Sequence, residues 1–248
     1  MNSKVVVITG ASSGIGASLA ELLGARGDSV ALVARRGDKL SAVTARSGSK
    51  ALSIVADVTE RSEVQRIVKE ALGRFGHVDV WVNNVGQGIT LPPSQLTDED
   101  VDRVMQVNVK SALYGMQEIL PHFIERGEGQ IINVSSLLGR MPYAVFRSAY
   151  NGAKHFLNAL TANFRMEFAD THPGIVFSLV SPGVVRTDFG KNALHGGPDS
   201  RQLPNSQSAE EVAAVIRDVI DSRRPDVYTR AGARDRVVEY YSRMGEDP

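Results

Sequence analysis

Short runs of β-branched residues alternate with longer amphipathic stretches along the whole chain, and no other feature restricts the fold as strongly. The runs Val5–Ile8 and Ile131–Val134 do not alternate with polar residues, which is typical of strands that are buried on both faces. Strands of this kind, separated by helices, form a parallel sheet that is covered on both sides. The pattern therefore predicts an α/β fold, a Rossmann-like doubly wound parallel sheet of seven strands with helices on both faces.

The boundaries of these elements follow from where each pattern begins and ends. The expected strands are Val5–Thr9, Ser29–Ala34, Ala51–Val55, Val78–Asn83, Gln130–Val134, Ile175–Val180 and Val227–Thr229. The expected helices are Gly14–Arg26, Lys39–Arg46, Arg61–Phe75, Asp98–Arg126, Ala149–Asp170, Ala209–Ser222 and Ala233–Arg243. Ser208 and Glu211 have capping-box spacing, which defines the start of the helix at Ala209.

The chain has 248 residues, enough for one large domain or two small ones. Its longest stretch without a regular pattern is Ser181–Gln207, which is rich in glycine, proline, asparagine and serine. Connections of this length are more often lids or binding loops than linkers. A domain boundary there is the alternative, but it would leave only one helix and one strand beyond it. We therefore expect a single domain over residues 1–248, with a substrate lid at 188–207.

Composition and charge exclude several classes of protein. The 28 Lys and Arg residues balance 28 Asp and Glu residues, which argues against general binding to nucleic acids or anionic membranes. The absence of cysteine excludes disulfides, thiolate metal sites and cysteine nucleophiles. No apolar run approaches the roughly 20 residues that span a bilayer, and the first residues lack the layout of a signal peptide. We expect a soluble, cytoplasmic protein.

A glycine-rich turn follows the first expected strand and leads into the first helix. Glycines let the backbone approach a ligand there, and the N-terminus of a helix attracts an anion such as a pyrophosphate. The spacing is Gly-x-x-x-Gly-x-Gly, which differs from the Gly-x-Gly-x-x-Gly pattern and from a Walker loop. A turn that only packs a helix on the sheet is the alternative, which the position after the first strand disfavours. The residues expected to bind a cofactor there are Gly10, Ser12, Ser13, Gly14, Ile15 and Gly16.

Two arginines, Arg35 and Arg36, end the second expected strand, about 20 residues beyond the glycines, where an NAD-selective site places an acidic residue. A guanidinium binds a phosphate through two parallel charge-assisted hydrogen bonds. The alternative is a solvated charge pair, since arginine is usually exposed. The position favours a site for the 2′-phosphate of NADP(H).

Tyr150 and Lys154 lie four residues apart and therefore share one face of a helix. A nearby ammonium favours the phenolate, so the spacing predicts a lowered tyrosine pKa and a group that gives and takes a proton. Ser136 follows the strand Gln130–Val134, at the carboxyl edge where open α/β sheets bind ligands. An exposed Tyr–Lys pair and a turn serine are the simpler interpretations.

Taken together, these features resemble the short-chain dehydrogenase/reductase superfamily in its single-domain form of about 250 residues. The resemblance extends over nearly the whole chain, because the motifs occur in the order that the family has. The matching segments are Thr9–Gly16, Asp57, Asn83–Gly86, Asn108, Ser136, Tyr150 with Lys154, and Pro182–Thr187.

The resemblance implies a role for each matching position. Ser136 would hydrogen-bond the substrate carbonyl, Tyr150 would protonate it, and Lys154 would tune Tyr150 and bind the nicotinamide ribose. Asn108 would position a water that links Lys154 to solvent. The further cofactor contacts implied are Asp57 and Val58 at the adenine, Asn84, Val85 and Gly86 on the adenosine side, and Val185 and Thr187 at the carboxamide, with Pro182 and Gly183 also binding the cofactor.

The sequence departs from the family pattern at three places. Val85 stands where the family usually has alanine, and Ala153 stands where it commonly has serine. The spacing from Ser136 to Tyr150 is one residue longer than expected, so Ser135 is an alternative catalytic serine. Gly139 follows Ser136 by three residues, as the family's glycine does, which favours Ser136 and places the extra residue in Arg140–Arg147.

Other candidate residues carry less weight. The five histidines, His77, His122, His155, His172 and His195, lack the i,i+3 or i,i+4 spacing of a helical metal site, so we expect no metal and treat them as structural or surface residues. Two helices have wide apolar faces, the first around Val101, Val104, Met105, Leu113 and Met116 and the second around Phe156, Leu157, Leu160 and Phe164. Core packing explains such faces, but the family resemblance implies that they form a homodimer or homotetramer.

The sequence thus predicts an NADP(H)-dependent oxidoreductase that transfers a hydride between nicotinamide and a ketone, an aldehyde or the corresponding alcohol. Loop residues expected to flank the nicotinamide suggest a substrate with an apolar body; they are Met141, Pro142, Tyr143, Phe146, Phe189 and Leu194. The first alternative is a regulatory protein that senses NADP(H) without chemistry. The second is a nucleic-acid-binding protein that uses Arg230–Arg243, a segment in which Asp235, Glu239 and the following Glu246 dilute the positive charge.

Overall fold

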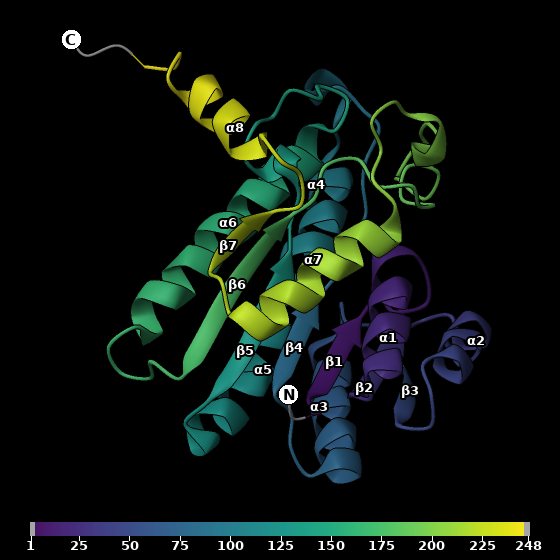
Figure 1. Cartoon of the computed structure of the whole chain (residues 1–248). Helices are drawn as coiled ribbons and strands as arrows, with labels where there is room; N and C mark the ends of the chain where they lie inside the picture. The colour runs from purple at the N-terminus through teal and green to yellow at the C-terminus, as the bar shows by residue number, and fades with distance from the viewer. Residues whose placement is uncertain (1–2, 246–248) are drawn as a thin grey trace.

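The apolar runs form one sheet of parallel strands in the order β3-β2-β1-β4-β5-β6-β7 (Figure 1). The computed structural model describes residues 3–245; Glu246 of the nucleic-acid alternative lies outside them. The strands are β1 Val5–Thr9, β2 Ser29–Ala34, β3 Ala51–Val55, β4 Val80–Asn83, β5 Gly129–Val134, β6 Ile175–Ser181 and β7 Asp226–Tyr228. The prediction of a doubly wound seven-stranded sheet is confirmed, with strand ends that move by one or two residues.

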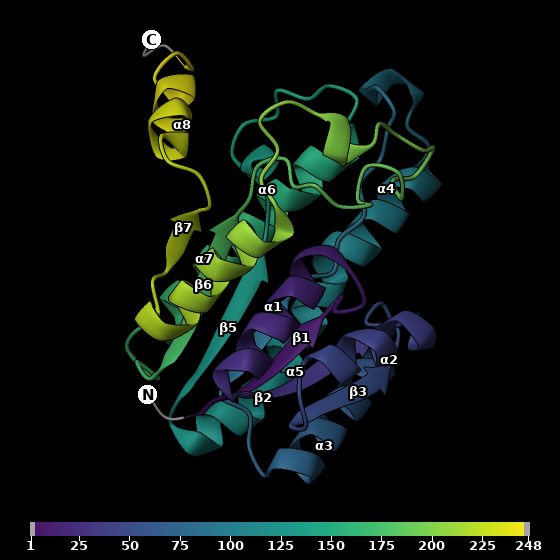
Figure 2. The ribbon, with the colours of Figure 1, turned by 45° about the vertical axis from the view of Figure 1, so that its right-hand side comes forward.

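Helices cover both faces of this sheet. Their bounds are α1 Gly14–Arg26, α2 Gly37–Arg46, α3 Arg61–Phe75, α4 Asp98–Met105, α5 Ser111–Arg126, α6 Ser148–Phe168, α7 Ala209–Ser222 and α8 Ala233–Tyr241. Figures 1 and 2 show α1 and α7 side by side over one face. The helices α3, α5 and α6 pack on the opposite face, and α8 extends beyond the sheet next to β7.

Two hydrophobic cores result from the alternation of side chains along each strand. On β1, Val6 and Ile8 point toward α1, α2 and α7, whereas Val5 and Val7 point toward α3 and α5. All four side chains are buried, as are Val30–Ala34 on β2 and the residues of β4. Strands that are buried on both faces explain why these runs are continuously apolar.

One expected helix, Asp98–Arg126, is interrupted. Its first part is α4, which begins with a capping box between Thr97 and Asp100. A π-helical segment, η2 (Gln106–Lys110), separates α4 from α5. Such segments widen a helix by one residue and are frequent at functional sites. Apolar periodicity did not predict the interruption, because a single wide turn leaves the apolar face almost unchanged.

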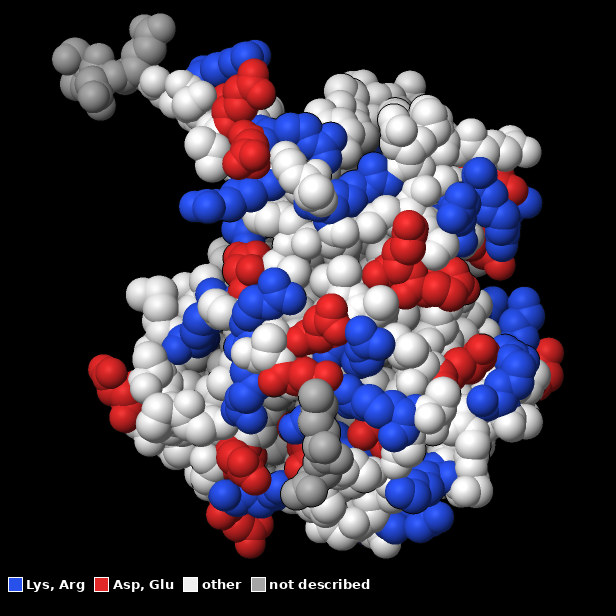
Figure 3. Space-filling model, viewed as in Figure 1, with Lys and Arg blue, Asp and Glu red and all other residues white. Residues whose placement is uncertain are grey.

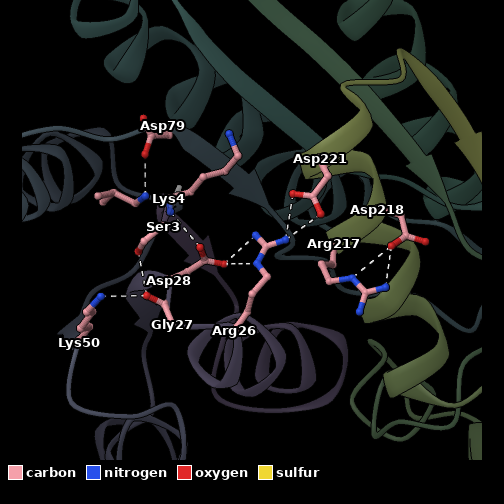
Figure 4. A network of polar contacts seen from close by, with 11 residues as sticks. Ser3, Lys4, Arg26, Gly27, Asp28, Lys50, Asp79, Arg217, Asp218 and Asp221 are labelled. Carbon is pink, nitrogen blue, oxygen red and sulfur yellow. Dashed lines mark hydrogen bonds and ion pairs between the residues drawn. The ribbon is translucent and has the colours of Figure 1, made fainter. Parts of the chain in front are cut away.

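Polar contacts hold the amino ends of β1 and β2, opposite the edge where the strands end (Figure 4). The buried Asp28 carboxylate accepts a hydrogen bond from the Lys4 backbone amide at 2.9 Å and one from Arg26 Nε at 2.7 Å. Asp79 Oδ2 accepts from the Val5 amide at 2.7 Å. This edge is therefore fixed by structural contacts, and the loops at the carboxyl edge are free to form a site.

Acidic and basic side chains are intermixed on the face shown in Figure 3. The stretch Arg230–Arg243 includes α8, on which Asp235 and Glu239 lie among the arginines, and Glu239 pairs with Arg243. Within residues 3–245, no helix is long and apolar enough to cross a membrane.

Candidate active site

Two adjoining cavities lie at the carboxyl edge of the sheet, where β1 and β4 meet and the strand order reverses. Open α/β sheets bind their ligands at this switch point. The first cavity, of about 490 Å³, is lined by the glycine-rich turn and the ends of β2 and β3. The second, of about 390 Å³, is lined by the ends of β5 and β6 and by α6. Ile15, Asn84, Gly86, Thr187 and Phe189 line both.

The glycine-rich turn leaves the N-terminus of α1 open toward the first cavity. Ser13, the N-cap residue, makes no side-chain cap to the helix, so the first amides stay available for an anion. Gly10 and Gly14 have positive φ angles of 69° and 57°. A side chain at Gly16 would lie 2.5 Å from the Gly10 carbonyl oxygen, so only glycine allows the turn to close. The turn thus fits a phosphate group, as the sequence predicts.

Arg36 is the arginine that reaches this turn. Its guanidinium donates hydrogen bonds to Ser12 Oγ at 2.9 Å and to Ser13 Oγ at 2.8 Å. Arg35 instead lies near the end of β3 on the opposite side of the first cavity, where its Nη1 is 3.6 Å from Asp57 Oδ2. The two arginines therefore have different surroundings, a distinction that their adjacency in the sequence does not reveal.

Asp57 and Val58 form the far wall of this cavity. The Asp57 carboxylate accepts hydrogen bonds from the Thr59 amide at 3.0 Å and from the Thr59 hydroxyl at 2.8 Å. Partial burial alone would raise the pKa of Asp57, but the bonds from Thr59 and the charge of Arg35 outweigh it and lower that pKa. Asp57 is therefore a negatively charged acceptor at neutral pH.

The segment Asn84–Gly86 lies where the two cavities meet, and Asn84 and Gly86 line both of them. Asn84 Nδ2 donates to the Thr9 carbonyl at 3.0 Å, which ties the end of β4 to the glycine-rich turn. Val85 packs into the core beneath α3 and α5 while lining the cavity, so its extra bulk is partly absorbed by the protein interior. A side chain at Gly86 would lie 3.1 Å from Asn108 Oδ1, which explains the glycine at this position.

The two serines after β5 have different partners. Ser135 Oγ donates to Asn158 Oδ1 at 2.5 Å, so its hydroxyl is engaged with α6. Ser136 Oγ accepts from the Leu138 amide at 3.1 Å, and its hydroxyl faces Tyr150 and lines the second cavity. This geometry favours Ser136 over Ser135 as the residue that binds a substrate oxygen.

Tyr150 and Lys154 stand on one face of α6, and both are buried. Burial raises the pKa of Tyr150 to about 12, although the Ser136 hydroxyl and the Arg147 guanidinium lower it in part. Burial also lowers the pKa of Lys154 to about 8. Lys154 Nζ donates to the Val134 carbonyl at 3.0 Å and lies 5.7 Å from the centroid of the Tyr150 ring. The prediction of a lowered tyrosine pKa is therefore wrong, because desolvation outweighs the distant ammonium.

Polar contacts inside the core fix α6 against the sheet. Asn133 on β5 donates to Thr161 Oγ1 at 2.8 Å and accepts from Asn83 Nδ2 at 2.8 Å. Asn158 Nδ2, one turn beyond Lys154, donates to the Gly139 carbonyl at 2.7 Å. These bonds set the distance between α6 and the segment Ser135–Gly139 after β5, and therefore the position of Tyr150 relative to Ser136.

Asn108 lies in the π-helical segment and is almost fully buried. Its Nδ2 donates to the carbonyls of Gln87 and Val104, each at 2.9 Å, and its Oδ1 accepts from the Gln87 amide at 3.1 Å. Its side chain is thus behind Gly86 and lines neither cavity. The water that the family resemblance implies at Asn108 stays a prediction.

The loop after β6 covers the second cavity. Pro182, Gly183, Val185 and Thr187 line it, and the Pro182 carbonyl accepts from the Leu137 amide at 2.7 Å. The predicted lid, 188–207, contains one short 3-10 turn, η4 (Ser200–Gln202), and is attached to the body through Leu194, whose amide donates to the Gly88 carbonyl at 2.9 Å.

The cavities thus bring together nearly all the predicted site residues; Gly16 and Asn108 support them from behind. Of the loop residues expected beside a substrate, Tyr143, Phe146 and Phe189 line the second cavity. Met141 and Leu194 do not, because Met141 packs with α8 and Leu194 packs beside Ile89. Pro142 also lies outside the lining.

His195, expected to be a structural or surface residue, lines neither cavity; its Nε2 lies 2.7 Å from Asp100 Oδ1 and joins the segment 188–207 to α4. Two residues of the site were missed from the sequence. Arg147 lines the second cavity, and Asn158 Nδ2 donates to the Gly139 carbonyl just after Ser136. Arg147 is three residues before Tyr150 and Asn158 is four after Lys154, so helical spacing could have indicated both. No cluster of His, Asp and Glu among residues 3–245 could hold a metal ion.

Comparisons with known proteins agree with this geometry. A model of the short chain dehydrogenase family matches residues 4–196. An uncharacterized oxidoreductase of Staphylococcus epidermidis is 34% identical over 200 residues, 77% of this chain and 84% of its own. An alcohol dehydrogenase of Thermococcus sibiricus, solved with 5-hydroxy-NADP, is 28% identical with a TM-score of 0.79, covering 92% of this chain and 96% of its own. A short chain dehydrogenase/reductase of Burkholderia phymatum, solved with NAD, has the same fold at 24% identity, with a TM-score of 0.89 over 100% of this chain and 98% of its own.

The chain belongs to the short-chain dehydrogenase/reductase family of oxidoreductases.

Proposed function

We propose that this protein is an NADPH-dependent reductase of ketones or aldehydes, able to run in reverse as an alcohol dehydrogenase. One observation carries the proposal: Ser136, Tyr150 and Lys154 line a cavity that adjoins the glycine-rich cavity. A phosphate cradle next to an oriented proton donor is what hydride transfer to a carbonyl requires.

The residues around the second cavity supply the chemistry that a carbonyl needs. Bound NADPH would supply the hydride. The Ser136 hydroxyl donates a hydrogen bond to the carbonyl oxygen, and Tyr150, whose pKa of about 12 keeps it protonated at neutral pH, gives that oxygen its proton. Lys154 adds positive charge beside the tyrosinate that remains and lies where it can bind a ribose hydroxyl.

The test is the oxidation of NADPH in the presence of a panel of ketones and aldehydes. We expect turnover with at least one apolar carbonyl compound and the matching alcohol as its product. Tight NADPH binding without hydride transfer to any compound, together with a protein partner in a pull-down, would instead support the regulatory alternative.

Replacing Arg36 by alanine should weaken NADPH binding by about 10- to 100-fold, because a guanidinium–phosphate pair with charge-assisted bonds contributes about 1.5–3 kcal/mol. The affinity for NADH, which lacks the 2′-phosphate, should change by less than about threefold. Calorimetric titration of both nucleotides measures the two affinities. Arg217→Ala on α7, remote from the cavity, is the matched control. An equal loss for both nucleotides would remove the phosphate role from Arg36.

The exposed face of α6 supports a homodimer or homotetramer. Phe156 and Met166 are 51% and 75% exposed on this helix, and Val101 on α4 is 40% exposed. Other residues of the expected faces, Val104 and Met116 among them, are buried in the core, so an association surface would be formed by the exposed side chains alone. Sedimentation at micromolar concentration should show a dimer or tetramer, and Phe156→Arg should dissociate it; a wild-type monomer would contradict the proposal.

A further inference from the structure

The second cavity carries a positive charge that nothing in its wall neutralises. Two cationic residues, Arg147 and Lys154, line it, and no aspartate or glutamate does. The rest of the wall is mostly apolar, including Tyr143, Phe146 and Phe189. Lys154 is accounted for by the proposed reaction. Arg147 lowers the pKa of Tyr150 in part, but the proposed reaction gives it no contact with the substrate or the cofactor.

Arg147 is held rigidly at the start of α6. The residue is 7% exposed, and its Nη1 donates to the Ile89 carbonyl at 3.1 Å and to Thr90 Oγ1 at 3.2 Å. Gly88 and Gly197 leave the space for it, because a side chain at Gly88 would lie 2.9 Å from Nη1 and one at Gly197 would lie 3.5 Å from Nη2. The guanidinium is thus fixed between the body and the lid.

The remaining edge of this guanidinium has no hydrogen-bond partner among the described residues, and the group lies over the Phe146 ring, 5.4 Å from its centroid. Within residues 3–245, Nε and Nη2 make no hydrogen bond and no carboxylate pairs with Arg147. The titratable group beside it is Tyr150, whose phenol is neutral at pH 7. A largely buried cation without a counter-charge carries a desolvation cost that an anionic ligand would offset. Nε and Nη2 are not among the fully buried atoms that lack a partner, so a ligand can reach them.

We propose that Arg147 binds a carboxylate of the substrate, so that the protein reduces carbonyl compounds in which an apolar body carries an acid group. The Nε–Nη2 edge matches a carboxylate through two parallel hydrogen bonds. Pairing within an apolar cavity strengthens such bonds. The inference rests on the proposed function only in taking the cavity beside Tyr150 as the substrate site.

Binding of unreactive probes tests the inference without turnover. Calorimetry with benzoate and its neutral isostere benzamide, in the presence of NADP⁺, should give at least tenfold tighter binding of benzoate to the wild type. Arg147→Met should reduce that ratio to about one and Arg147→Lys should retain part of it, while NADPH affinity stays within about twofold. Arg217→Met, on an exposed ion pair with Asp218 (Figure 4), is the matched control and should keep the wild-type ratio.

Three results would overturn the inference. They are equal binding of the two probes by the wild type, no binding of benzoate, and a benzoate preference that survives in Arg147→Met and therefore belongs to Lys154. If Arg147→Met does not fold, the inference is tested by the benzoate-to-benzamide affinity ratio of the wild type and by the reduced ratio expected for Arg147→Lys. A preference for benzoate in a protein that reduces no carbonyl compound would contradict the proposed reaction alone. Turnover of neutral ketones by a protein that does not prefer benzoate to benzamide would contradict the inference alone.

Discussion

Tyr150→Phe is expected to lower kcat for carbonyl reduction by about 10²- to 10⁴-fold, the range that a positioned proton donor contributes. The substitution removes only the hydroxyl, and the ring keeps its contact with Phe189, whose centroid lies 5.4 Å away. NADPH affinity should therefore change by less than about threefold. Steady-state rates and calorimetry measure the two quantities separately.

The matched control for this variant is Tyr143→Phe. Tyr143 also lines the second cavity, but its side chain is 58% exposed and it lies on the loop before α6. We expect its kcat to stay within about threefold of the wild type. A Tyr150→Phe enzyme that retained most of the wild-type rate would assign the proton to another group.

Lys154→Met is expected to lower kcat by about 10²-fold or more. The same substitution should raise the free energy of unfolding of the protein measured without nucleotide. Lys154 is 2% exposed, and its one hydrogen bond, to the Val134 carbonyl, does not repay the desolvation of an ammonium. Methionine fills a similar volume without the charge. Urea unfolding at pH 7 should show a gain of about 1–3 kcal/mol.

The pH dependence of that gain identifies its cause. Burial lowers the pKa of Lys154 to about 8, below its ordinary value of 10.5. Between these values the unfolded chain binds the proton that the folded protein has lost, so the wild type gains stability as the pH rises from 8 to 10.5. The advantage of Lys154→Met should therefore shrink at pH 10. A gain that is equal at pH 7 and pH 10 would exclude the charge as its origin, and Lys69→Met, on the exposed side of α3, should show no gain.

The fold could be predicted because the decisive signals are local. Buried strands such as Val5–Thr9 are continuously apolar, and the turns at their carboxyl ends contain glycines. What could not be predicted depends on hydrogen bonding between neighbouring turns. The π-helical segment at Gln106–Lys110 differs from an α-helix by one bond register, which leaves no mark on apolar periodicity.

The site could be predicted in its composition but not in its electrostatics. Tyr150 and Lys154 share a helical face as their spacing indicates, yet the sequence gives no measure of how deeply each is buried. Burial reverses the expected direction of the tyrosine pKa. The partner of Arg36 and the isolation of Arg147 likewise depend on residues more than 20 positions away, Ser12 and Ile89 among them.

Calorimetric titration of the wild-type protein with NADPH and, in parallel, with NADH tests the central claim most directly. The account predicts tight NADPH binding, with NADH at least tenfold weaker, a difference of about 1.4 kcal/mol. Equal binding of the two nucleotides would remove the phosphate site at Arg36 from the account. No binding of either would contradict it as a whole, since the glycine-rich cavity would then serve no nucleotide and the residues around Tyr150 would have no source of hydride.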